Sequence, residues 1–138
     1  MSIQKTNHPT VLLFPGTSGA LTAVGGAADN LNSAWIDTSG WTDKKISYVV
    51  TGANTDADII AHLSPMGYSE LTDLGTSVST QHYKAVTITT AIAAQTMGSV
   101  DSDDVDDLKR PIRSMRINIS NDSATAITAF KVWIEGWS

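Results

Sequence analysis

Histidines and aspartates are the residues of this chain whose types could do chemistry. The histidines are His8, His62 and His82, and an imidazole can bind zinc or move a proton near neutral pH. No spacing among them matches a zinc-ligand motif, so we expect ordinary surface or core-edge histidines. His62, between Ala61 and Leu63, is predicted to lie on the strand face opposite the core and to point towards solvent or a partner.

An acidic segment is the strongest local charge feature of the chain. Five aspartates fall within it: Asp101, Asp103, Asp104, Asp106 and Asp107. Calcium takes six to eight oxygen ligands, so these carboxylates are weak candidates for a cation site. The EF-hand pattern does not fit, because counting from Asp101 places Val105 at a ligand position and Asp106 where glycine is required. A solvated acidic loop is the favoured interpretation. A third interpretation is that the aspartates make an electrostatic contact with the basic residues that follow them in the sequence, either within the subunit or on a neighbouring one.

No nucleophile or phosphate-binding motif is found in the sequence. Gly16-Thr-Ser-Gly19 lacks the Gly-x-Ser-x-Gly spacing of a nucleophile elbow, and no helix is predicted after it. Neither Gly-x-x-x-x-Gly-Lys nor Gly-x-Gly-x-x-Gly occurs, so no phosphate cradle is predicted. The chain has no cysteine, which excludes disulfides and thiolate metal sites. We therefore expect a protein that is not an enzyme and that holds no cofactor.

Composition and charge narrow the range of partners. The 138 residues suffice for one domain with its own core. The net charge is −5, which disfavours general binding to nucleic-acid phosphates. The N-terminus lacks the charged and apolar regions of a signal peptide, and no apolar run approaches the roughly 18 residues of a membrane helix. We expect neither nucleic acid nor a membrane as a partner.

Alternation of apolar and polar residues predicts the elements that position these side chains. Segments 45–51, 57–63, 83–89, 112–120 and 126–135 are strand-like and are separated by turn residues. We expect 112–120 and 126–135 to form a half-buried antiparallel strand pair around a turn at 121–125. A connecting loop is expected between Pro65 and Gly75, whereas 90–98 has helical potential. The predicted fold is an all-β antiparallel sandwich, jelly-roll-like or Ig-like.

Residues 1–33 differ in composition from the rest of the chain. Their glycine pairs and lack of periodicity predict an extended N-terminal arm with one strand at 10–14, followed by a β-sandwich domain at 34–138. Such an arm is either partly disordered or ordered by packing on a partner.

Trp133 is predicted to stand on the outer face of the last strand. If Val132 and Ile134 face the core, Trp133 points outward between Lys131 and Glu135. An outward tryptophan fills a groove under the chain's own arm, stacks on a sugar ring or anchors a protein contact. All three alternatives are open at the level of sequence.

Two stretches resemble small β-sandwich proteins carried on the particles of tailed bacteriophages. The segment from Trp35 to Gly52, which begins Trp-Ile-Asp-Thr-Ser-Gly-Trp-Thr-Asp-Lys, resembles their opening. Arg113-Ser-Met-Arg-Ile-Asn-Ile-Ser120 resembles their late strand. The layout matches over roughly residues 34–135, only these two stretches match in letters, and the arm has no counterpart. The resemblance implies a virion structural protein, either a capsid cement or decoration protein that bridges neighbouring shell subunits or an accessory subunit of the tail.

The same resemblance implies a location in the virion, as a homo-oligomer bound to the major capsid protein or to other virion subunits. The residues expected to make contact are Leu12, Phe14, Leu21, Arg113, Arg116 and Trp133. An alternative from a different class is a carbohydrate-binding module that uses Trp133, Trp41 or Tyr68.

Overall fold

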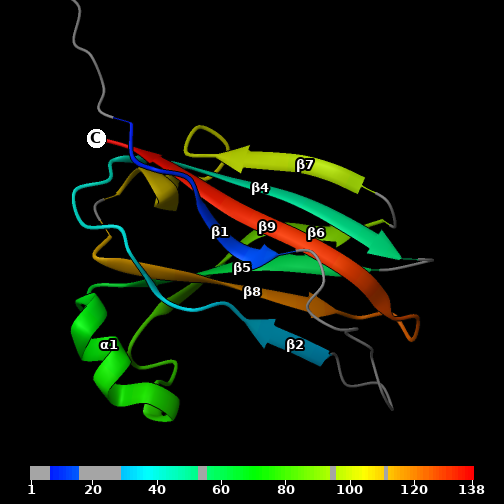
Figure 1. Ribbon diagram of the computed structural model, residues 1–138, viewed down its shortest axis with the longest axis horizontal. Helices are drawn as coiled ribbons and strands as arrows, with labels where there is room; N and C mark the ends of the chain where they lie inside the picture. The colour runs from blue at the N-terminus through cyan, green and yellow to red at the C-terminus, as the bar shows by residue number, and fades with distance from the viewer. Residues whose placement is uncertain (1–6, 16–28, 53–55, 94–95, 111) are drawn as a thin grey trace, which may run out of the picture.

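The computed structural model describes residues 7–15, 29–52, 56–93, 96–110 and 112–138 (Figure 1). Their strands are β1 (Val11–Pro15), β2 (Asp29–Asn32), β3 (Ile36–Asp37), β4 (Asp43–Gly52), β5 (Ala57–Ser64), β6 (Lys84–Ile92), β7 (Thr96–Asp101), β8 (Ser114–Asn121) and β9 (Ile127–Trp137). The helix α1 (Tyr68–Leu74) and two 3₁₀ turns, η1 (Gly75–Ser77) and η2 (Asp106–Lys109), lie between strands.

The strands form two antiparallel sheets with a nested order. The first sheet has the order β1-β9-β4-β7; the second has the order β2-β8-β5-β6, with β3 also paired to β8. Antiparallel ladders join β5 to β6, β4 to β7, β2 to β8 and β1 to β9. Successive partners therefore lie farther apart along the chain, as in one long hairpin rolled into two layers. This order is a jelly roll, so the predicted all-β sandwich is confirmed in its jelly-roll form.

The core lies between the two sheets and follows the predicted alternation. From β4, Ile46 and Val50 are fully buried, and from β5, Ile59 and Ala61 are fully buried, as expected for strands with one face inward. Leu108, in η2, is also fully buried and belongs to the same apolar cluster. The side chains that point away from this core form the two outer faces of the sandwich.

The predicted pairing of the last two strands is wrong, although both strands exist. β8 lies in the second sheet, and β9 lies in the first between β1 and β4. The connection after Asn121 therefore carries the chain across the core rather than forming a hairpin. Alternation indicates which face of a strand is buried, but two strands that face one core from opposite sheets show the same pattern as two paired strands.

The helix α1 lies where a loop was expected between Pro65 and Gly75, and the described part of the expected helical segment 90–98 lies mostly in strands β6 and β7. α1 begins where the Glu70 carboxylate accepts a hydrogen bond of 3.1 Å from the Gly67 backbone N–H, and it ends at Gly75, whose φ is 53°. Its buried residue, Leu71, anchors it to the body of the protein. Residues 90–92 instead continue β6, and residues 96–98 begin β7.

Parts of segment 1–33 belong to the two sheets. β1 confirms the strand expected at 10–14 and is an edge of the first sheet, paired with β9. β2 is an edge of the second sheet, where Asn118 Nδ2 donates to the side-chain oxygens of Asn30 at 3.2 Å and Asn32 at 2.8 Å. The division of the chain between residues 33 and 34 stays a prediction about folding units.

Candidate functional site

The outer face of the first sheet is an open surface with Trp133 near its centre. We call it the Trp133 face; its residues are Leu12, Lys45, Ser47, Val49, Met97, Ser99, Lys131, Trp133 and Glu135. Trp133 of β9 lies beside Leu12 of β1 and Ser47 of β4, and Ser47 in turn lies beside Ser99 of β7. One row away, Lys131 lies beside Val49, which lies beside Met97. These registers confirm that Trp133 points away from the core.

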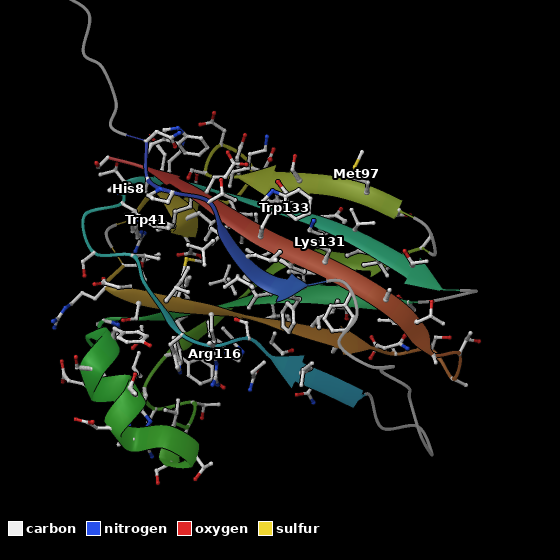
Figure 2. All side chains as sticks on the ribbon, viewed as in Figure 1. His8, Trp41, Met97, Arg116, Lys131 and Trp133 are labelled. Atoms are coloured by element: carbon white, nitrogen blue, oxygen red, sulfur yellow. The ribbon has the colours of Figure 1, made fainter. Side chains whose placement is uncertain are left out.

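The apolar side chains of the Trp133 face are unusually exposed. Leu12 is 51% and Met97 is 76% exposed, and they are two of the four large apolar side chains recorded as exposed within the described ranges. Trp133 is half-buried, and the Lys131 Nζ lies 5.6 Å from the centre of its ring. A groove of about 220 Å³ runs over Lys45, Met97 and Trp133. Figure 2 shows Lys131, Trp133 and Met97 on this side of the molecule.

The outer face of the second sheet carries a stacked cluster that covers it. We call it the Arg116 cluster; it consists of Trp35, His62, Tyr83 and Arg116. The His62 and Tyr83 rings are stacked with centroids 4.0 Å apart. The Arg116 guanidinium lies 4.6 Å from the Trp35 ring centre and 5.2 Å from that of Tyr83. Both distances are within the range of a cation–π contact, so the subunit's own side chains cover this part of the face.

His62 accepts a hydrogen bond inside the Arg116 cluster. The Arg116 Nε–H donates to His62 Nδ1 at 2.9 Å, which requires a neutral imidazole with its proton on Nε2. Burial, and then the neighbouring Arg116 charge, lower the pKa of His62 to about 4. The prediction that His62 lies opposite the core is confirmed, but its pointing to solvent is wrong: the side chain is 7% exposed because Tyr83 and Arg116 cover it.

A buried lysine lies beside the acidic segment. The Lys44 Nζ is fully buried and donates to the carbonyl oxygens of Trp41, Leu108 and Arg110 at 3.0–3.2 Å. Burial lowers the pKa of Lys44 to about 8. Sequence analysis missed this residue, although alternation from Ile46 already places position 44 on the inner face of β4.

Four of the five aspartates make side-chain contacts within the subunit: Asp101, Asp103, Asp104 and Asp107. Asp101 Oδ1 accepts hydrogen bonds from the backbone N–H groups of Asp103 and Asp104, and Asp104 Oδ2 accepts one from the N–H of Asp101. Asp103 and Asp107 form exposed ion pairs with Lys109 at 3.4 Å and Lys84 at 3.5 Å. Among the residues that the structure describes, no three His, Asp or Glu side chains gather closely enough to hold a metal ion.

Among the predicted contact residues, Phe14 lies in the core rather than on the surface. Phe14 is 3% exposed and packs edge-to-face on Phe130, with ring centres 4.9 Å apart, so its side chain belongs to the core. Leu21 lies outside the described residues. Arg113 is exposed and lies 3.6 Å from a Glu70 carboxylate oxygen. A contact role for Leu12, Arg113, Arg116 and Trp133 stays a prediction.

The three aromatic residues considered for sugar binding differ in exposure and location. Trp41 is 6% exposed, stacks on His8 with ring centres 5.2 Å apart, and packs so closely on Gly136 that a Cβ there would clash. It is therefore not available for a ligand. Tyr68 is 46% exposed, but it lies on α1, whereas Trp133 lies on the first sheet. The structure does not bring these three aromatic side chains onto one surface.

Comparisons with known proteins show likeness in fold alone. No protein-family model and no curated protein sequence matches the chain. VP2 of infectious bursal disease virus, solved as a subviral particle, matches with a TM-score of 0.54 and 11% identity over 96% of this chain and 32% of VP2. The structure of the Gx strain of the same virus matches with a TM-score of 0.52 and 9% identity, over 97% of this chain and 33% of the matched chain. The xylan-binding module CBM15 matches with a TM-score of 0.45 and 15% identity, over 99% of this chain and 86% of the module.

The chain thus shares its β-sandwich with a viral particle protein and spans about a third of the length of those VP2 chains. Within the described ranges, none of the helices is both long enough and apolar enough to cross a membrane.

Proposed function

We propose that this chain is a non-enzymatic structural protein of a bacteriophage virion, a capsid cement protein that uses its Trp133 face for a protein–protein contact within the particle. The observation that supports this proposal is the contrast between the outer faces of the two sheets. The Arg116 cluster covers His62 on the second sheet, whereas Leu12 and Met97 are exposed and Trp133 is half-buried on the first. Exposed apolar patches rimmed by charge mark protein-binding surfaces.

The arrangement around Trp133 resembles a protein-binding centre. Aromatic anchors at the middle of an interface, surrounded by smaller contacts, supply most of the binding energy. Here Trp133 has Leu12 on one side and Ser47 on the other, with Lys131 and Glu135 at its ends. In a symmetric shell, many such contacts act together, so a modest affinity at each site suffices.

A carbohydrate-binding module is the second candidate, because Trp133 lies beside a groove that contains the hydroxyls of Ser47 and Ser99. The position of Lys131 favours a protein partner instead. Its ammonium group lies over the Trp133 ring and occupies a surface on which a sugar would stack. A sugar would have to displace this contact, whereas a partner carboxylate would add to it.

Density-gradient fractionation of the native source, with mass spectrometry of each fraction, tests the proposal. We expect the chain with virus-sized particles at a copy number near that of the shell protein. A few copies for each particle would assign it to the tail rather than to cement. Recovery as free protein alone would contradict a virion role, and binding of glycans by the wild type but not by a Trp133→Ala variant would then support the second candidate.

A further inference from the structure

Two opposite charges flank Trp133 on β9. Lys131 and Glu135 lie two residues to either side of Trp133 on β9, and all three side chains point outward. The strand therefore presents the sequence positive, aromatic, negative to any partner. A partner surface that matches it must present the same order in reverse.

We propose that the partner of the Trp133 face is a second copy of this chain, joined face to face by a two-fold axis at Trp133. An axis in the plane between the sheets and perpendicular to the strands sets β9 antiparallel to β9 of the second copy. Lys131 then faces Glu135 of the second copy, and the reverse pair forms on the other side of the axis. An axis parallel to the strands would instead oppose Lys131 to itself, which like-charge repulsion disfavours.

The first sheet supplies just enough area for such a contact. Its strands β1, β9, β4 and β7 have 5, 11, 10 and 6 residues. At about 3.3 Å a residue and about 4.8 Å a strand, they cover about 500 Å². Two such faces bury about 1,000 Å², which is the least area expected of a specific interface. Trp133 and Val49 lie on the two central strands of this area, whereas Leu12 lies on its β1 edge and Met97 on its β7 edge.

The inference rests on the proposed protein-binding role of the Trp133 face and deepens it. A dimer joined through this face leaves the remaining surface of each copy free for a shell subunit, so the pair bridges two neighbours. The virion role and the dimer are nevertheless measured separately, the first on particles and the second on purified protein without particles.

Charge-swap variants test the arrangement by sedimentation-equilibrium ultracentrifugation of the full chain. Lys131→Glu places two acidic residues opposite two acidic residues, and Glu135→Lys places basic opposite basic. We expect the wild type to dimerise and each variant alone to have a dimer Kd raised at least about tenfold. Because residues 131 and 135 of the two variants are complementary, an equal mixture is expected to form a heterodimer near the wild-type Kd.

The matched control is Lys84→Glu, which makes the same charge change on an exposed residue of β6 in the second sheet. It should leave the dimer Kd unchanged, and circular dichroism should show all variants folded. A wild type that stays monomeric at 100 µM (about the upper range of such an experiment) would overturn the dimer. Dimers of both single variants with unchanged Kd would overturn this interface. In either case particle association still decides the virion role.

Discussion

The two outer faces of the sandwich use the same chemical pair in opposite ways. Each carries a cation over a tryptophan ring: Arg116 lies 4.6 Å from the centre of Trp35, and Lys131 lies 5.6 Å from that of Trp133. The Arg116 pair is covered by Tyr83 and hydrogen-bonded to His62, whereas Lys131 is exposed. The first arrangement lies within one subunit, and we propose that the second meets a partner. The two pairs have the same chemistry and differ in how many other side chains of the subunit contact them.

The largest expected difference in stability is between alanine substitutions of the buried Trp41 and of the half-buried Trp133. Trp41→Ala should lower the free energy of unfolding by about 3–5 kcal/mol, because it empties a buried site between His8 and Gly136. Trp133→Ala should lower it by about 1 kcal/mol or less, because the half-buried ring leaves no internal cavity. Urea denaturation measures both. Equal losses would show that Trp133 is a structural residue like Trp41.

Alanine substitution of Arg116 and of Lys131 should give a smaller difference in stability, again with the larger loss at the more covered residue. Arg116→Ala should cost about 2–4 kcal/mol of stability, because it removes the hydrogen bond to His62 and the contacts with Trp35 and Tyr83 together. Lys131→Ala should change stability by less than about 0.5 kcal/mol, since its contact is exposed. Thermal unfolding of the two variants side by side is sufficient. A Lys131 effect as large as that of Arg116 would remove the distinction between the faces.

A pH dependence specific to the Arg116 cluster is expected from His62. Its pKa is about 4 in the folded protein and 6.5 as the ordinary value, so the unfolded chain binds the extra proton between these limits. Stability is therefore full above about pH 6.5 and falls as the pH decreases towards 4. The loss from this group is up to about 3 kcal/mol. The loss should be absent from His62→Gln, so the difference in unfolding free energy between wild type and this variant, measured by urea denaturation, should change across that window. Parallel pH profiles of the two proteins would contradict the assignment.

The smallest effect is expected at the exposed ion pairs. Lys109→Ala removes the pair with Asp103 and should change the unfolding free energy by less than about 0.5 kcal/mol, because water solvates both groups. Lys44→Met is the contrasting variant: it leaves three backbone carbonyls without a donor and should cost about 2–4 kcal/mol. Urea denaturation of the pair tests whether the acidic segment is held by Lys44 rather than by surface charge.

Period-two alternation was sufficient for β4, β5, β6, β8 and β9 and for the direction of Trp133, but β2, β3 and β7 were missed because they are short or lack that alternation. It was not sufficient for the sheet to which each strand belongs, since β8 and β9 alternate alike and face the core from opposite sides. The burial of His62 could not be predicted either, because Trp35 and Tyr83 come from distant parts of the chain. α1 did carry a local signal, the spacing from Gly67 to Glu70, which matches half of a capping box.

Oxidation of methionine in particle-bound protein tests most directly whether the Trp133 face is buried in the functional assembly. Met97 lies on this face and is 76% exposed in the single chain, whereas Met115 is fully buried in the core and serves as the internal reference. We expect dilute peroxide followed by mass spectrometry to modify Met97 rapidly in the chain diluted to monomer and slowly in particles, with Met115 protected in both. Equal oxidation of Met97 in the two states would contradict a binding role for this face.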